Sequence, residues 1–128
     1  MPIAELLQAQ ADGHLFVACL DTTLVGFALV QRHNPYLHLL EMSVDPVFGR
    51  RGVGRGLLNH VLDTGQQLAA QAVTLTTFED IAWNAPFYAS AGFTKIDESA
   101  LPLHVIEHLQ NERSEGLTQR IGMMHCFQ

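Results

Sequence analysis

The chain has 128 residues, of which 48% are hydrophobic and 16% charged, a composition typical of globular rather than disordered proteins. Its formal net charge of −6 disfavours non-specific binding to nucleic acid or to anionic membranes. No apolar run reaches the roughly 18 residues of a membrane span, and the N-terminus does not follow the pattern of a signal peptide. We therefore expect one cytoplasmic domain over residues 1–128, with reduced thiols at Cys19 and Cys126.

The first part of the chain favours strands. Residues 3–11 suit a short helix. The apolar runs 14–20 and 24–33 are separated by a polar turn and predict an antiparallel hairpin. A third strand is expected over 36–44, where an Asp-Pro pair stops it.

The second part alternates helices with strands. Leucines, valines and alanines from Leu57 to Ala72 follow helical spacing and predict an amphipathic helix of about four turns. The order of elements predicts an α/β (α+β) fold, with a mixed sheet that carries helices on its faces. The elements expected after the long helix are strand 72–78, a helix from Asn84 that ends before Gly92, strand 93–98, helix 101–113 and strand 117–127.

Between the third strand and the long helix, residues 49–56 read GRRGVGRG and hold four glycines and three arginines. The first amides of a helix have no intrahelical partner, and the helix dipole adds partial positive charge there. Glycine lets an anion approach the backbone closely, and arginine adds positive charge. Because a helix follows directly, we predict a phosphate-binding turn rather than a flexible basic loop. The residues match neither a P-loop nor a dinucleotide-binding fingerprint.

This turn, together with WNAPFYASAGF at 83–93, resembles the GNAT superfamily of acyl-CoA-dependent N-acyltransferases. The family's pyrophosphate loop has Gln or Arg, then Gly three positions later and Gly or Ala two further on, as in Arg51 to Gly56 here. A strand that ends in an apolar-x-Val-x-Pro segment precedes that loop in the family and in this chain. The resemblance implies that acetyl-CoA binds at Met42, Ser43, Val44, Arg50, Arg51, Gly52, Val53, Gly54, Arg55, Gly56 and Asn84.

The resemblance covers roughly residues 14–98 and implies the family's mixed, mostly antiparallel sheet flanked by helices. Few residues precede the hairpin, so the family's first strand is expected to be absent. Two explanations stay open, a truncated chain or a second subunit that completes this side in a homodimer. Asn84 lies closer to the tyrosine of its motif than the family's usual asparagine does. A coenzyme A ligand and a helix N-cap are therefore both open roles for it.

In GNAT enzymes an amine attacks the acyl carbonyl directly, while a backbone amide of the central strand polarises that carbonyl. The resemblance makes Tyr88 the general acid for the departing thiolate, and a packed core tyrosine is the alternative. Glu41 is the first candidate for the general base, and a mechanism without a dedicated base stays open. The other candidates are His38, expected on the opposite face of its strand, and Glu79 and Asp80 at the end of the next strand.

We therefore predict an N-acetyltransferase that moves an acetyl group from acetyl-CoA to an amine of a small molecule or protein, through a ternary complex. The alternative is a non-catalytic acyl-CoA-binding or regulatory domain of the same fold. No metal is expected. His104 and His108 match a zinc-peptidase spacing, but the rest of the chain lacks a third ligand and the accompanying domain. The seven histidines are scattered over the sequence and are expected not to form a cluster.

Overall fold

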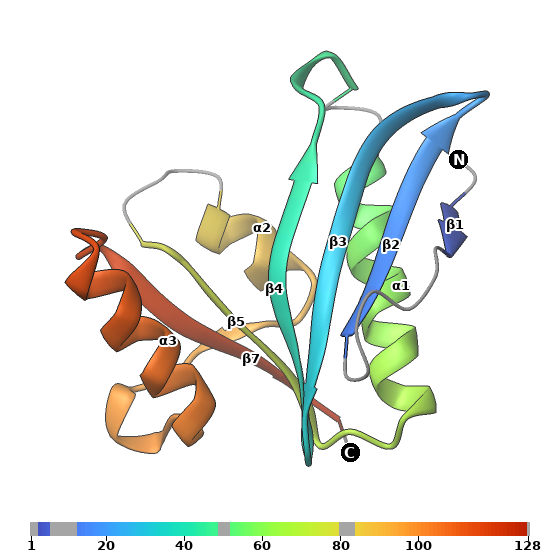
Figure 1. Ribbon diagram of the computed structural model, residues 1–128. Coiled ribbons are helices and arrows are strands. Elements are labelled where there is room, and N and C mark those ends of the chain that lie inside the picture. Colours follow the sequence, from blue (N-terminus) through green and yellow to red (C-terminus); the bar gives the residue numbers. More distant parts are fainter. Residues whose placement is uncertain (1–2, 6–12, 49–51, 80–83, 128) are drawn as a thin grey trace.

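The computed structural model describes residues 3–5, 13–48, 52–79 and 84–127 of the protein (Figure 1). In this part of the chain, seven strands form one sheet in the order β1-β2-β3-β4-β5-β7-β6. The strands are β1 (Ile3–Glu5), β2 (Gly13–Leu20), β3 (Thr23–His33), β4 (Tyr36–Val44), β5 (Ala72–Phe78), β6 (Thr94–Lys95) and β7 (Arg120–Cys126). The α-helices are α1 (Val53–Gln67), α2 (Asn84–Ser90) and α3 (Leu103–Ser114), with short 3₁₀ turns at Pro46–Phe48 and Glu98–Ala100.

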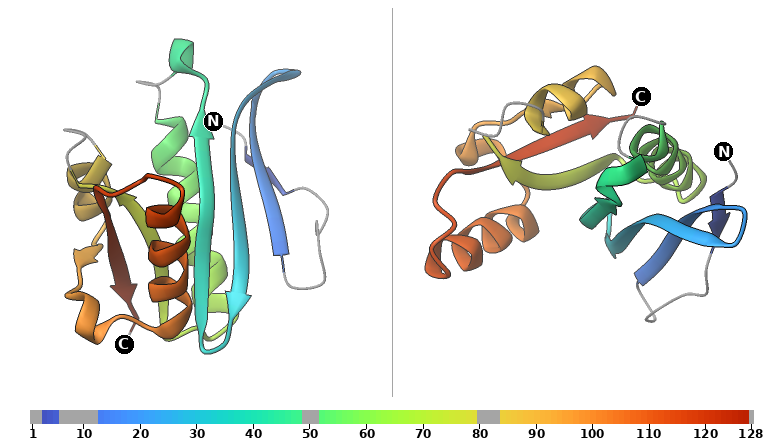
Figure 2. Two further views of the ribbon diagram at one scale, coloured as in Figure 1. Left: turned by 60° about the vertical axis from the view of Figure 1, so that its left-hand side comes forward. Right: turned by 90° about the horizontal axis from the view of Figure 1, so that it is seen from above.

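The sheet is mixed and mostly antiparallel, as expected. Strands β1 to β4 form an antiparallel meander, and β7 pairs antiparallel with both β5 and β6. The one parallel pairing in the described residues joins β4 to β5, with α1 as the crossover between them. Helices α1 and α2 cover one face of the sheet, and α3 covers the other (Figures 1 and 2).

Two apolar clusters hold these layers together. On the face of α1 and α2, the buried side of α1 packs on the inner residues of the sheet, with Leu57, Leu58 and Val61 fully buried. On the other face, Val105 and Leu109 of α3 pack against the C-terminal strands. Each such buried aliphatic side chain contributes about 1.5–3 kcal/mol relative to leaving it in water. None of the described helices combines the length and apolar composition that a membrane crossing requires.

Most expected elements are confirmed, and β4 and β5 have the predicted bounds. The expected strand over 93–98 is wrong except at Thr94–Lys95. It ends early because the side chain of Asp97 accepts a hydrogen bond from the backbone N–H of Ser99 and starts a 3₁₀ turn.

The expected helix over 3–11 is wrong at its beginning, because Ile3–Glu5 form β1 and pair with residues 16–18 of β2. Pairing along the free edge of β2 overrides the local helical preference of so short a segment. A strand therefore does precede the hairpin, and the expected absence of the first strand is corrected to a strand of three residues. Residues 6–12 lie outside the described part of the chain.

Candidate functional site

The sheet opens between β4 and β5. Tyr36, Leu37 and His38 pair with residues 72–74, and within the described chain no pairing between the two strands is recorded beyond that point. The strands then diverge, as Figure 1 shows. Leu39 and residues 41 to 44 of β4 stay paired with β3 on one side, so the other edge of the strand keeps unpaired backbone groups toward the gap.

A β-bulge at Leu40 accompanies the opening. Leu39 lies opposite Val30 and Glu41 lies opposite Leu29, which leaves Leu40 as the extra residue in β4. A bulge of this kind bends the strand and increases its local twist. It thereby turns the end of β4 away from β5.

The bulge also changes which side chains face the core. Leu37 and Leu39 belong to the core cluster on the α1 side, and the next β4 residues that pack there are Met42 and Val44. Glu41 and the exposed Ser43 alternate with these and therefore point to the opposite face, the face that His38 shares. The expectation that His38 and Glu41 point to opposite faces is wrong. Regular alternation would place them on opposite faces, but the extra residue Leu40 shifts the alternation by one position and puts both on the same face.

The first turn of α1 lies at one end of this opening. Gly52, the N-cap, has φ 77 and ψ 11, a left-handed conformation that favours glycine. The first helical hydrogen bond runs from Gly56 N to Gly52 O at 2.9 Å, so the amides of Val53, Gly54 and Arg55 have no intrahelical acceptor. No side chain caps this end, and its first turn holds no acidic residue.

A pocket of about 360 Å³ lies directly beside these amides. A Cβ atom added at Gly54 would lie 3.5 Å from Phe87 Cζ and 3.7 Å from Val44 Cγ2, so it would fit the fold but project beside the pocket. Gly52 has no atom within 4 Å of an added Cβ and faces open space. The pocket is lined by Met42, Val44, Gly52, Gly54, Arg55, Asn84, Phe87 and Tyr88.

Arg55 holds the two helices beside the pocket together. Its guanidinium donates to the backbone carbonyl and hydroxyl oxygens of Ser90, at the end of α2, and lies 5.4 Å from the centre of the Phe87 ring. Its positive charge is thereby fixed at the pocket wall. Arg50 and Arg51, which the sequence also predicts to bind phosphate, lie outside the described residues.

A second pocket of about 220 Å³ continues the first into the gap between the strands. The two share Met42, Asn84 and Tyr88, so they form one cleft from the helix terminus through the sheet. We call the two pockets together the cleft. The second pocket is lined by Leu39, Leu40, Glu41, Met42, Leu75, Thr76, Thr77, Phe78, Asn84, Tyr88 and Arg120.

Tyr88 lies at the junction of the two pockets, between the rings of Phe87 and Phe93, whose centres are 5.3 and 5.8 Å from its own. Burial raises the pKa of its hydroxyl above the ordinary value of 10.0, and the positive charge of Arg120 opposes that shift. The side chain is therefore a protonated donor over the whole neutral range.

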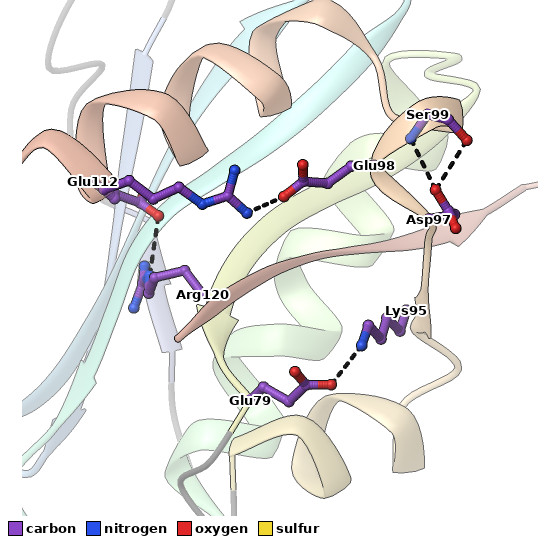
Figure 3. A network of polar contacts seen from close by, with 8 residues as sticks. Glu79, Lys95, Asp97, Glu98, Ser99, Glu112 and Arg120 are labelled. Atoms are coloured by element: carbon purple, nitrogen blue, oxygen red, sulfur yellow. Dashed lines mark hydrogen bonds and ion pairs between the residues drawn. The ribbon is translucent and has the colours of Figure 1, made fainter. Parts of the chain in front are cut away.

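The structure brings eight of the described site residues that the sequence predicts to the cleft, whereas five do not line it: Ser43, Val53, Gly56 and the base candidates His38 and Glu79. Met42, Val44, Gly52, Gly54, Arg55, Asn84, Tyr88 and Glu41 all line the cleft. Asn84 is the first residue of α2 and its N-cap role stays a prediction. Glu79 does not line the cleft; it lines a neighbouring pocket and pairs with Lys95 (Figure 3). Asp80 lies outside the described residues.

Sequence reasoning missed a polar group at the wall of the cleft. Arg120 Nε donates to Glu112 Oε1 at 3.0 Å (Figure 3), and the hydroxyl of Thr76 donates to Glu112 Oε2 at 2.8 Å. The guanidinium also lies 4.5 Å from the centre of the Phe78 ring. These residues come from β5, α3 and β7, so no local spacing signals that they meet.

The expectation that the histidines do not cluster is also wrong. His33, His38, His104 and His108 lie in contact beneath α3, with ring centres 4.4 to 6.3 Å apart. The HVIEH spacing did place His104 and His108 on one face of a helix, but the partners come from β3 and β4. Among the described residues, no three side chains are arranged to hold a metal ion.

Comparisons with known proteins agree with this geometry. The model of the Acetyltransferase (GNAT) family matches residues 2–93. The chain is 36% identical over 78 residues to the [ribosomal protein bS18]-alanine N-acetyltransferase of Salmonella typhimurium, which covers 59% of this chain and 51% of that protein. The chain thus spans about half the length of the curated relative it matches.

Solved structures share the fold. The ribosomal-protein-S18-alanine N-acetyltransferase from Escherichia coli superposes with a TM-score of 0.73 at 22% identity, over 91% of this chain and 70% of that one. The PaiA N-acetyltransferase from Thermoplasma acidophilum, solved in complex with coenzyme A, gives a TM-score of 0.71 at 17% identity, over 91% and 62%. At these identities the likeness concerns the fold.

Proposed function

Since the chain belongs to the GNAT acetyltransferase family, we propose that it transfers an acetyl group from acetyl-CoA to an amine. The observation that carries this proposal is the continuous cleft. It joins the unpartnered amides at the start of α1 to Tyr88 and to the unpaired edge of β4. The end at α1 suits an anion, and the junction of the two pockets offers a proton donor.

The residues at the start of α1 fit the diphosphate of coenzyme A. Three backbone donors point out of the helix terminus, the dipole adds positive charge, and no acidic side chain of the first turn opposes an anion. Gly54 keeps the wall beside them free of a side chain. The thioester supplies an activated acetyl group when it is bound. Arg50 and Arg51 are proposed to add charge at the rim.

The chain's own residues supply the remaining needs of the reaction. The free edge of β4 offers the backbone N–H groups of Met42 and Val44, which would polarise an acyl carbonyl in the gap, while the N–H of Ser43 faces β3. Tyr88 holds a proton at its hydroxyl, because burial keeps its pKa high, and we assign it the role of general acid.

We assign the role of general base to Glu41. Its side chain reaches the cleft from the exposed face of β4, where it can accept a proton from an entering ammonium group, directly or through water. His38 is a weaker candidate, because it is buried beneath α3 and does not line the cleft. Glu79 is a weaker candidate because it does not line the cleft and its charge is paired with Lys95.

The acceptor is proposed at the level of an amine, of a small molecule or of a protein. A homodimer, a cytoplasmic location and a single domain over residues 1–128 stay predictions from the sequence. A non-catalytic acyl-CoA-binding domain is the alternative that the same cleft allows.

The test measures release of coenzyme A thiol from acetyl-CoA with a panel of amines and amino-terminal peptides. We expect turnover with at least one acceptor and a strong loss on Tyr88→Phe. Tyr36→Phe is the matched control, because Tyr36 is the chain's other tyrosine and lies outside the cleft. Tight binding of acetyl-CoA without turnover on any acceptor would instead support the non-catalytic alternative.

A further inference from the structure

A group of four histidines lies between α3 and the sheet, away from the cleft. His33 comes from β3, His38 from β4, and His104 and His108 from consecutive turns of α3. We call them the histidine cluster. His38 stacks on His108 with ring centres 4.4 Å apart and planes at 1°, and His33 stacks on His104 at 4.6 Å and 3°. The rings of the two pairs meet edge to face.

Thr74 of β5 links the two pairs. Its hydroxyl lies 2.7 Å from His38 Nδ1 and 2.8 Å from His104 Nε2, and its residue is fully buried. A hydroxyl has one proton, so Thr74 donates to one ring nitrogen and accepts from the N–H of the other. This arrangement needs at least one neutral ring. If both rings were imidazolium ions, both nitrogens would donate and the Thr74 proton would lose its ring acceptor.

We propose that the histidine cluster is a pH-sensitive latch, which holds α3 on the sheet at neutral pH and releases it in mildly acidic solution. Stacked neutral imidazoles pack well, but stacked imidazolium ions repel each other across the same short distance. His38 is 2% exposed, so water cannot reach it to screen that repulsion while α3 stays in place.

The electrostatic surroundings agree with a neutral cluster. Burial, followed by the charges of the other three histidines, lowers the pKa of His38 from 6.5 to about 2. Burial, followed by His33 and His108, lowers the pKa of His104 to about 4. Burial also lowers the pKa of His108.

Charged groups on the neighbouring elements do not cancel this effect. Glu107 and Glu112 of α3 raise the pKa of His108, but burial outweighs them. Glu112 is already hydrogen-bonded to Arg120 of β7. Tyr36 of β4 contributes an aromatic ring whose centre lies 5.5 Å from that of His104.

The sign of the pH dependence follows from linkage. Each of these histidines has a lower pKa in the docked state than its ordinary 6.5, so the released state binds more protons below that pH. The equilibrium constant for docking of α3 is unaffected well above pH 6.5. Below that pH it falls, by up to about tenfold per pH unit for each histidine. For His104 the loss continues down to about pH 4.

Release of α3 would change the cleft because it would remove Glu112 from Arg120. This helix residue orients Arg120, which lines the second pocket and whose charge acts on Tyr88. The latch would therefore regulate the site, and this consequence, unlike the latch itself, rests on the proposed function.

The experiment follows amide hydrogen exchange in the full chain at about pH 7.5 and about pH 5, corrected for the intrinsic exchange rates. Protection of α3 is compared with that of α1, which reports on global opening. We expect α3 to lose at least about tenfold more protection than α1 at the lower pH. If the ratio of α3 protection to α1 protection is the same at both pH values, the latch is overturned.

The double variant His38→Asn, His104→Gln removes two titrating groups and keeps their contacts to Thr74. An Asn amide replaces Nδ1, and a Gln amide replaces Nε2. We expect most of the pH dependence of α3 protection to disappear. His125→Asn is the matched control, because His125 makes its Nδ1 contact to Ala91 outside the cluster, and it should behave as the wild type. Full pH dependence in the double variant would refute the proposal.

A second measurement serves if the double variant does not fold. Carbon chemical shifts of the wild-type imidazole rings report the protonation of each histidine directly. We expect His38, His104 and His108 to stay neutral until α3 is released and then to titrate together. Independent titration near pH 6.5 without release would overturn the latch. Neither readout uses coenzyme A, so a chain that lacks turnover but shows release would refute the proposed function alone.

Discussion

Arg55, in the first turn of α1, donates hydrogen bonds to Ser90 at the end of α2. The contact joins the helix that presents unpartnered amides to the helix that carries Tyr88. It ties the first turn of α1, at one end of the cleft, to the helix of Tyr88, although the side chains of both partners reach solvent.

The Arg55–Ser90 contact gives a first prediction. Ser90→Ala removes one hydrogen bond between exposed groups, so the free energy of unfolding should fall by less than about 1 kcal/mol. Arg55→Gln removes the same contact and also a positive charge from the pocket wall. Calorimetry should therefore show weaker coenzyme A binding for Arg55→Gln, by roughly tenfold, than for Ser90→Ala. Equal affinities for the two variants would show that Arg55 acts as a structural tie alone.

Gly54 gives the sharpest test of the anion site. Gly54→Asp places a carboxylate in the first turn of α1, where the dipole stabilises it, so the fold should keep its stability. The same charge should weaken coenzyme A binding by at least about tenfold relative to Gly54→Asn, which has the same shape. Titration calorimetry on both variants measures the difference. Equal affinity of the Asp and Asn variants would place the phosphates elsewhere.

Tyr88→Phe removes the proton donor without changing the ring. We expect kcat to fall by about 10²- to 10⁴-fold, while the Kd for coenzyme A changes little. Burial raises the pKa of Tyr88 above 10.0, and a general acid works in its protonated form. In the wild type, deprotonation of Tyr88 should therefore lower kcat only above pH 10. The variant should lack this step in its pH profile. An unchanged kcat would leave Tyr88 as a packing residue.

Glu112→Gln should destabilise the protein. The side chains of Arg120 and Glu112 are 18% and 19% exposed, so removing one charge leaves the other partly buried and unpaired. The free energy of unfolding in urea should fall by about 1–3 kcal/mol at an unchanged m-value. Glu98→Gln breaks the exposed pair with Arg113 and should have little effect. Similar values for both variants would show that burial of the Arg120 pair adds nothing.

Local patterns predicted much of the fold. The β-branched run 72–78 and the run 36–44 gave the bounds of β5 and β4, because a strand's alternation and its Pro stop are local signals. The glycines beside a leucine-rich helix predicted an anion site, since the unpartnered amides of a helix terminus do not depend on distant residues. Tyr88 and Asn84 followed from a family motif.

Features that depend on distant pairing could not be predicted. The helical preference of the first residues lost to the free edge of β2, which lies outside any local window. The contacts of Arg120 with Glu112 and the meeting of the four histidines require α3 to dock on a sheet whose order the sequence does not state. The bulge at Leu40 has no glycine or proline to mark it, so the faces of Glu41 and His38 were assigned incorrectly.

The extra residue at Leu40 makes the cleft depend on how many residues β4 contains as well as on their identity. Replacing Leu40 by another side chain leaves the bulge intact, whereas deleting it would place Leu39 and Glu41 in unbroken register with Val30 and Leu29, keep the side chains of β4 on their present faces, and remove the bend that turns the end of β4 away from β5. A survey of point substitutions would therefore pass over a position whose deletion would narrow the opening between β4 and β5.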